Sequence, residues 1–343
     1  MMRGRPMCLL AIIMLLLLLA ACCSADIQTS GNQLTITTEV YEARFIGPAI
    51  TYFRDIRTGE VLLDDPEPAA PLVRFIVGNN PVTVTGPAPS DYVVVQSSDT
   101  QVVLEASVDN DACQVQFRFT LQALPEELVI QATAHSETGY EGLATVSVPG
   151  GKPAAQTRLL VPFMGGVAFE ATKPTTQLII EWPISWEAGM MQVDGEQGGL
   201  LIACYDDDFS NFKNLELRPG DKCWKLFFET ENAAPFEGKR DVAGLEWHFR
   251  PYQGDWRVGA RHYREWLWRT TKPEIGEDAS WTREVRAEFH TGMDLETLDN
   301  LIAAGVDPAQ TLLYVASWRT NGYDRNYPDY TPDPLLAPFV ARA

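Results

Sequence analysis

The segment from Leu313 to Pro334 holds the residues whose types are best suited to binding a ligand. Trp318, Arg319, Asp324 and Tyr327 follow a short apolar run there. A carboxylate can accept hydrogen bonds from two hydroxyl groups of a sugar, an aromatic ring can stack on the apolar face of the sugar, and an arginine adds orienting donors. The alternative is a rigid, turn-rich loop in which Asp324 caps backbone amides.

The elements that must position this loop form one βαβ unit. The pattern predicts a strand over Arg283–Phe289, a helix over Asp294–Ala304 that Gly305 ends, and a second strand over Thr311–Ser317. The loop therefore follows the carboxyl end of a parallel strand. That end is the face on which (β/α) barrels form their sites.

His290 directly follows the first of these strands and is the other candidate on the same face. Alternation along the strand points Glu288 in the same direction. The alternative for His290 is a packed, hydrogen-bonded side chain without a ligand. A complete barrel needs about eight βα units and roughly 250 residues, so 281–343 is expected to be the truncated start of a barrel domain.

An amphipathic helix is expected before the barrel, within a connecting region at 254–280. Asp255 is a candidate N-cap, and an apolar face recurs at positions i, i+4, i+7 and i+11. The residues of that face are Trp256, Ala260, Tyr263 and Leu267. Lys272-Pro273 is expected to end the helix.

The region 26–250 consists mainly of short β-type runs separated by turn residues. This spacing predicts a mainly β fold, a large antiparallel sandwich of more than nine strands. The runs are Gln33–Tyr41, Tyr92–Ser97, Val102–Val108, Gln114–Leu121, Leu128–His135, Leu159–Pro162, Gln177–Glu181, Gly199–Tyr205 and Lys222–Glu229.

The first 22 residues have the layout of a secretory signal peptide. Arg3 and Arg5 precede the apolar run Leu9–Leu19, and small residues follow. The motif that ends at Cys22 also resembles a bacterial lipobox, which would make Cys22 the lipidated first residue of a cell-envelope lipoprotein. Ordinary cleavage near Ala21 is the alternative. Either version predicts export to the envelope, periplasm or exterior.

The net charge of −19 argues against nucleic acid and anionic membrane surfaces as partners, since both need clustered Lys and Arg. A membrane contact is then expected only through the lipid anchor. Neutral carbohydrate remains a suitable partner. We expect no cofactor and no metal, because nucleotide-binding motifs and zinc-type Cys/His spacings are absent from the sequence.

Two sequence features leave alternatives open. Cys204 and Cys223 stand at the ends of apolar runs that could pair as neighbouring strands and form a disulfide, or they could be buried free thiols like Cys113. The acidic run Asp206–Asp208 lacks the alternating spacing of a calcium loop and is expected to be a solvated turn.

The whole arrangement resembles a known group of bacterial enzymes. The sequence segments that carry the resemblance are Gly47–Asp55, Thr58–Leu63, Gly198–Ile202, Tyr252–Leu267 and Leu313–Pro334. With this order of elements, the chain resembles glycoside hydrolases built from an N-terminal supersandwich of galactose-mutarotase type and a (β/α)8 barrel. The similar families are the endo-α-N-acetylgalactosaminidase-like group and, more distantly, the α-galactosidase clan.

The resemblance implies a substrate-binding role for Asp324 on sugar hydroxyls, with Trp318 as a platform. Arg319, Tyr327 and His290 are the accompanying candidates. In these families the two catalytic carboxylates lie on later barrel strands, so here they are expected beyond Ala343. The competing hypothesis is a non-catalytic carbohydrate-binding or structural lipoprotein of the envelope.

Overall fold

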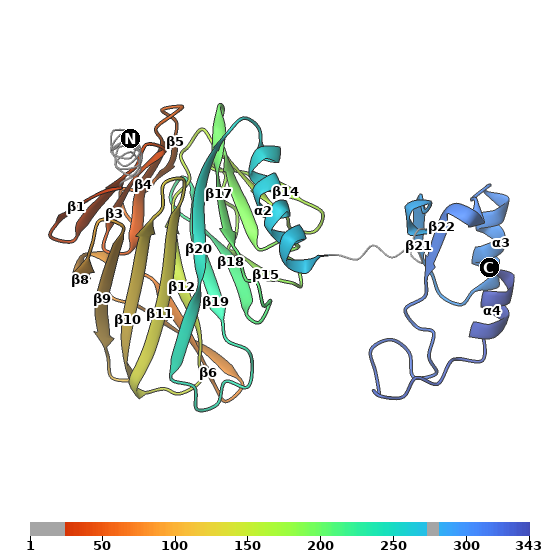
Figure 1. Cartoon of the computed structure of the whole chain (residues 1–343). Helices are drawn as coiled ribbons and strands as arrows, with labels where there is room; N and C mark the ends of the chain where they lie inside the picture. The colour runs from red at the N-terminus through yellow and green to blue at the C-terminus, as the bar shows by residue number, and fades with distance from the viewer. Residues whose placement is uncertain (1–24, 273–280) are drawn as a thin grey trace, which may run out of the picture. The chain divides into compact units, whose positions relative to one another are not determined.

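The computed structural model describes residues 25–272 and 281–343, which divide into two compact units between Thr271 and Lys272 (Figure 1). The expectations for the signal peptide, for Cys22 and for most of the connection at 273–280 lie outside these residues. Among the helices described, none has the length and apolar character needed to cross a membrane.

Within residues 25–272, the first unit is an antiparallel β structure with three sheets. The five-stranded sheet contains β1 (Asp26–Ser30), β2 (Gln33–Thr37), β3 (Tyr41–Ile46), β4 (Ala49–Asp55) and β5 (Val61–Asp64) in chain order. The six-stranded sheet has the order β15 (Leu178–Trp182), β18 (Phe212–Pro219), β19 (Trp224–Glu231), β12 (Leu143–Gly151), β6 (Leu72–Val77) and β7 (Asn80–Thr85).

The nine-stranded sheet forms the other large layer of this unit. Its order is β14 (Val167–Glu170), β13 (Arg158–Val161), β16 (Met190–Asp194), β17 (Gly198–Cys204), β20 (Asp241–Gln253), β11 (Leu128–Gly139), β10 (Cys113–Ala123), β9 (Gln101–Asp109) and β8 (Val93–Ser97). A short 3-10 turn, η1 (Pro89–Asp91), precedes β8.

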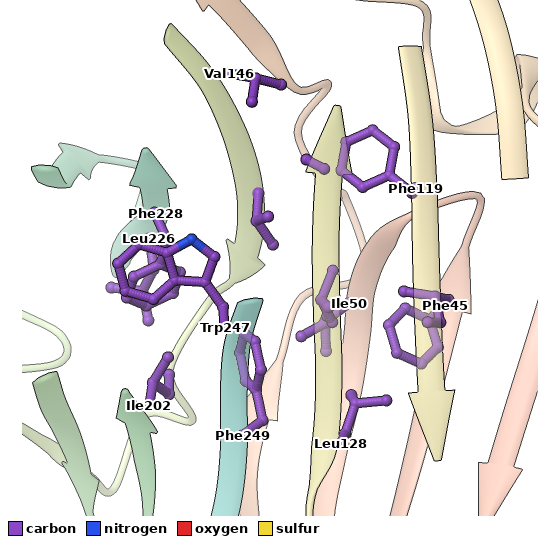
Figure 2. Close-up of a cluster of buried hydrophobic side chains, with 14 of the residues drawn as sticks. Phe45, Ile50, Phe119, Leu128, Val146, Ile202, Leu226, Phe228, Trp247 and Phe249 are labelled. Carbon is purple, nitrogen blue, oxygen red and sulfur yellow. The ribbon is translucent and has the colours of Figure 1, made fainter. Parts of the chain in front are cut away.

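The hydrophobic core lies between these layers, and period-two alternation builds it. In β10, Val115, Phe117 and Phe119 are buried while the residues between them are more exposed. Trp247 of β20 lies beside Phe228 of β19, with ring centroids 5.0 Å apart (Figure 2). Truncating a buried aromatic of this kind to alanine costs about 3–5 kcal/mol, so such pairs account for much of the cohesion between the sheets.

Strand β12 departs from alternation because it is buried on both faces. All of its residues are buried, and it contacts β11 and β20 of one sheet and β4 of the five-stranded sheet. Covered on two sides, it has no alternation of buried and exposed residues, and its two polar side chains, Thr145 and Ser147, are small. The predicted run Gln33–Tyr41 is two strands, because the Thr38 hydroxyl accepts hydrogen bonds from the amides of Val40 and Tyr41 and turns the chain.

The disulfide alternative for Cys204 and Cys223 is wrong. Cys204 lies in β17 of the nine-stranded sheet, whereas Cys223 immediately precedes β19 of the six-stranded sheet. Both thiols, and that of Cys113, are free and buried. Both runs are apolar enough to form strands, but strand pairing places the two strands in different sheets.

Helix α2 (Trp256–Thr271) packs on β16, β17 and β20. Its extent agrees with the sequence prediction. Of the predicted apolar face, Tyr263 is buried and Leu267 packs against the same cluster, but Trp256 is not buried. Gly259, Tyr263 and Trp266 are buried, while Trp256 is 49 % exposed. Gly259 decides the rotation, because a Cβ there would come within 2.7 Å of the Tyr252 ring, so only glycine allows this close approach.

The acidic run Asp206–Asp208 is not a solvated turn throughout. Asp206 is 5 % exposed, and its carboxylate accepts a hydrogen bond from the Lys213 ammonium at 2.9 Å. Asp207 accepts a bond from the indole of Trp266. The prediction was wrong for Asp206, which is buried with Lys213, and it holds for Asp207 and Asp208, which are exposed turn residues.

The second unit contains the predicted βαβ arrangement. β21 (Ala287–His290) pairs in parallel with β22 (Thr311–Tyr314), and α3 (Leu295–Ala303) connects them together with the 3-10 turn η3 (Pro308–Gln310). Asp294 caps α3 and Gly305 follows it with φ +79°. α4 (Leu336–Arg342) contacts α3. Both strands are shorter than predicted.

Candidate functional site

A long loop follows β22 and is closed by hydrogen bonds between its two ends. The Thr320 amide donates to the Thr331 carbonyl at 3.0 Å, and the Asp333 amide donates to the Trp318 carbonyl at 2.9 Å. These bonds pair the outgoing and returning segments of the loop. The loop is therefore held in one shape by its own backbone, as a binding loop requires.

Arg319 fixes the interior of this loop. It is 4 % exposed, and its guanidinium donates to the Asp329 carbonyl at 3.0 Å. The same group lies 4.4 Å from the ring centroid of Tyr327 and 5.6 Å from that of Tyr330. A cation over two aromatic faces orients both rings. We infer that Arg319 positions the tyrosines within the loop.

Asp329 does the backbone capping that the alternative hypothesis gave to Asp324. Its carboxylate accepts bonds from the hydroxyl and the amide of Thr331 and from the Asn321 side chain. The bonds from Thr331 and then Asn321 lower the pKa of Asp329. Asp329 is thus a structural acid of the loop, and Asp324 is left for another role.

Asp324 stands in the left-handed region with φ +53° and is exposed. For a residue other than glycine this conformation costs about 1 kcal/mol or more. The nearby Asp324 carboxylate raises the pKa of the Tyr327 phenol, so the two side chains interact. A strained, exposed carboxylate beside an aromatic ring matches the hydroxyl-binding role expected from the sequence.

The side chains of the loop and of the end of β22 enclose a hollow of about 120 Å³, here called the tyrosine hollow. It is lined by Tyr314, Val315, Ala316, Trp318, Arg319, Tyr323, Tyr327 and Tyr330. Three predicted residues, Trp318, Arg319 and Tyr327, are therefore brought together. Asp324 does not line the hollow but interacts with Tyr327, which does.

His290 lies at the end of β21 and contacts a lining residue of the tyrosine hollow. Its ring centroid is 4.8 Å from that of Tyr314, and its Nε2 is 3.1 Å from the Glu288 carboxylate. His290 and Glu288 share one exposed face, as alternation predicted. The His290 side chain is 73 % exposed, which leaves it accessible to a ligand.

Sequence reasoning placed Tyr323 on this loop but missed Tyr314 and Tyr330 as lining residues. The available signal was the aromatic-rich run at 323–330, which is unusual in an exposed loop. The site can stack rings and offer hydroxyl groups, and one carboxylate can accept hydrogen bonds. Within residues 25–272 and 281–343, no group of His, Cys, Asp or Glu side chains is arranged to hold a metal ion.

No family model matches the chain, and no curated protein matches it. Among solved structures, it is similar to the α-N-acetylgalactosaminidase NagBb from Bifidobacterium bifidum, solved in complex with GalNAc, with a TM-score of 0.53 and 11% identity. The match covers 92% of this chain and 56% of NagBb, so the chain spans little more than half the length of that protein.

Two smaller proteins match part of the chain. A putative aldose 1-epimerase from Escherichia coli K12 has a TM-score of 0.38 at 11% identity, over 67% of this chain and 99% of its own. A galactose mutarotase-like protein from Lactobacillus casei has a TM-score of 0.40 at 10% identity, over 64% and 100%. The likeness to NagBb at this identity is one of fold, and it confirms the predicted mainly β class.

Proposed function

We propose that this chain is the N-terminal part of an exported glycoside hydrolase, which cleaves O-glycosidic bonds of an oligosaccharide or glycan. The observation that carries the proposal is the tyrosine hollow, with the exposed Asp324 carboxylate interacting with Tyr327, one of its lining residues. It lies at the carboxyl end of a parallel strand that follows a β-sandwich and a helix. In barrel enzymes this end of the strands forms the active site.

The βαβ unit supports a larger barrel. β21 and β22 pair only with each other among the described residues, while parallel sheets are normally extended and covered on both faces. An apolar cavity of about 250 Å³ also lies between α3 and this sheet, lined in part by Leu298, Ile302 and Leu313. Further βα units would pair the strand edges and extend this core.

The fold likeness supports a choice of the first sugar to test. NagBb is named as an α-N-acetylgalactosaminidase and was solved with GalNAc, so N-acetylgalactosamine is the first sugar to test. In the proposed complex, a sugar hydroxyl donates a hydrogen bond to the Asp324 carboxylate, and Trp318 stacks against the sugar ring. The catalytic acid and nucleophile would come from later barrel strands than β22.

The test is titration of the chain with N-acetylgalactosamine, with binding measured by calorimetry and by ligand-observed NMR. A hydrogen bond to a charged group contributes about 1.5–3 kcal/mol, so Asp324→Asn is expected to weaken binding by about tenfold or more. The matched control is Asp299→Asn, an exposed aspartate on α3 that does not line the hollow. Equal affinities in the two variants would remove Asp324 from the site.

Hydrolysis of an aryl α-N-acetylgalactosaminide separates the enzyme from the alternative. The 343-residue chain is expected to bind without turnover. Turnover that disappears in Asp324→Ala would contradict our placement of the catalytic pair on later strands. Sugar binding by the natural full-length product with no hydrolysis of any glycan would instead favour a carbohydrate-binding or structural envelope lipoprotein.

Export and lipid attachment form a separate part of the proposal. The basic, apolar and small-residue order of the first 22 residues supports a cleaved leader, and the residues before Cys22 support lipidation. Cells that express the chain and are fed an alkyne-labelled fatty acid should attach the label to the protein. The Cys22→Ala variant should carry no label. Retained label in Cys22→Ala, lost in Cys23→Ala, would move the anchor by one residue.

A further inference from the structure

Helix α2 covers only part of one face of the nine-stranded sheet. α2 contacts β16, β17 and β20, and the β13–β14 hairpin continues the sheet beyond β16. A groove of about 420 Å³ lies there, here called the hairpin groove. It is lined by Arg158, Leu160, Val161, Pro162, Gly165, Gly166, Val167, Ala168, Met190, Gln192 and Trp256.

Strand register forms the floor of the hairpin groove. Leu160 of β13 pairs with Ala168 of β14 on one side and with Gln192 of β16 on the other. Directly paired residues point to the same face, so these three side chains form a row across the strands. Met190 lies two residues from Gln192 on the same strand and extends this apolar floor.

Gln192 is a lining residue of the groove with a polar atom that the protein itself does not satisfy. It is 2 % exposed, and its Oε1 is buried without a hydrogen-bond partner among the described residues. An unpaired buried oxygen costs about 1–3 kcal/mol and calls for an explanation. The oxygen lies against Gly259 of α2, where a Cβ would meet it at 2.6 Å, so it reaches a ligand in the groove only when the carboxamide rotates.

Arg158 supplies further donors at one end of the floor. Its Nη2 pairs with the Asp194 carboxylate at 2.5 Å, and its side chain remains 52 % exposed. A guanidinium has five N–H donors, and a single pairing uses only part of them. Glu170 stands opposite Arg158 in the β13–β14 pair. These three groups carry one positive and two negative charges, which disfavours an anionic ligand and leaves a neutral ligand with hydroxyl groups as the suitable class.

Trp256 supplies the apolar surface. It is the first residue of α2 and is 49 % exposed, although the sequence pattern placed it on the buried face of the helix. An exposed indole beside a carboxamide and a paired guanidinium is the combination that binds a pyranose, with C–H groups on the ring and hydroxyls on the polar groups. A volume of about 420 Å³ is in the range of small-molecule sites.

We propose that the hairpin groove is a carbohydrate-binding site for a pyranose of a neutral glycan, held by Trp256, Gln192 and Arg158. It lies wholly within the β-sandwich unit and is distinct from the tyrosine hollow. Its existence does not depend on the hydrolase proposal. A hydrolase with this groove would hold one part of its glycan on the sandwich, and a non-catalytic protein would use it as its binding site.

The test is ligand-observed NMR and calorimetry of the 343-residue chain with galactose, N-acetylgalactosamine, glucose and N-acetylglucosamine. Trp256→Ala is expected to weaken binding of at least one of these sugars by about fivefold or more, and Gln192→Leu by a similar factor. The matched control is Trp268→Ala, which removes an indole of similar exposure, 51 %, from a different surface of α2. Unchanged unfolding temperatures show that the variants are folded.

The tyrosine hollow is a possible second source of signal, so each measurement is repeated in an Asp324→Asn background. Binding that survives Asp324→Asn and is lost on Trp256→Ala supports the hairpin groove. Three results would overturn it: no binding of any of the four sugars in that background, equal binding by Trp256→Ala and the parent, or an equal loss in Trp268→Ala. A failure of Asp324→Asn to affect binding would count against the hydrolase site alone.

Discussion

The indole nitrogen of Trp266 donates a hydrogen bond to the Asp207 carboxylate at 2.7 Å and so ties the end of α2 to a loop of the sandwich. Thr270 donates to the same oxygen at 3.0 Å. Trp266 also packs against Tyr263 and Tyr205, with ring centroids 5.0 and 5.3 Å away. One carboxylate thus fixes the last turns of the helix before the chain leaves the sandwich.

Replacing Asp207 by alanine should loosen this part of α2. We expect amide hydrogen exchange at 263–271 to become about fivefold faster or more, with the sheets unaffected, because the helix keeps its apolar contacts but loses the anchor of its last turns. Asp208→Ala is the control, since Asp208 is the exposed neighbour. Equal exchange in the two variants would show that Asp207 does not hold the helix.

The buried ion pair next to this anchor should matter more for global stability. The Lys213 ammonium bonds the Asp206 carboxylate at 2.9 Å and lies 3.7 Å from the ring centroid of Trp182. Asp206→Asn leaves the buried ammonium without its counter-charge, so the free energy of unfolding in urea should fall by about 3 kcal/mol. In Arg118→Ala, which breaks the more exposed pair with Glu105, it should change by less than about 1 kcal/mol.

A second variant separates charge from packing at this site. Asp206→Asn combined with Lys213→Met removes both charges, and it should recover a large part of the stability lost in Asp206→Asn alone. A double variant as unstable as the sum of the two single variants would mean that the pair is not coupled.

Local signals explain which elements were predictable from the sequence. Asp294 and Gly305 specify the two ends of α3 within one segment, and both act as predicted. The face of α2 could not be read in this way. Its rotation depends on Tyr252, whose ring Gly259 approaches, and a helical pattern that counts only large apolar residues leaves a glycine out.

The loop after β22 also combines features that the local sequence predicts with features that depend on tertiary contacts. The position of the loop after β22 followed from the βαβ pattern, and Trp318 and Tyr327 do line one hollow. The roles of the acids depended on contacts across the loop. Asp329 accepts a hydrogen bond from the Thr331 amide, whereas Asp324 stays exposed next to Tyr327, a difference set by loop closure rather than by residue type.

The contact between Glu127 and His248 predicts a pH dependence. Burial alone would raise the pKa of Glu127, but the hydrogen bond and charge of His248, 3.1 Å away, and the charge of Arg250 together hold it below its ordinary value of 4.5. A lowered carboxyl pKa stabilises the folded state above the unfolded-state value, and this stabilisation is lost as the pH falls through the folded-state value.

Glu127→Gln should therefore lower the unfolding temperature by a few degrees at pH 5.5, and the difference from the parent should shrink as the pH falls below about 4.5. Thermal unfolding between about pH 3 and 5.5 measures this. Glu246→Gln is the control, because Glu246 is 3.9 Å from His248 and has a 58 % exposed side chain. A difference that stays constant over this range would show that Glu127 is not stabilised as an anion.

The three cysteines of the sandwich should be unreactive in the folded protein. Cys113, Cys204 and Cys223 are each at most 3 % exposed, and burial raises the pKa of the Cys204 thiol to about 12. Only the thiolate attacks an alkylating reagent, so peptide mass spectrometry should find these residues modified by iodoacetamide only after unfolding in guanidinium. Dithiothreitol should leave the unfolding temperature of the sandwich unchanged, because Cys113, Cys204 and Cys223 are free thiols. A peptide linked through Cys204 and Cys223 under non-reducing conditions would contradict the strand order found here.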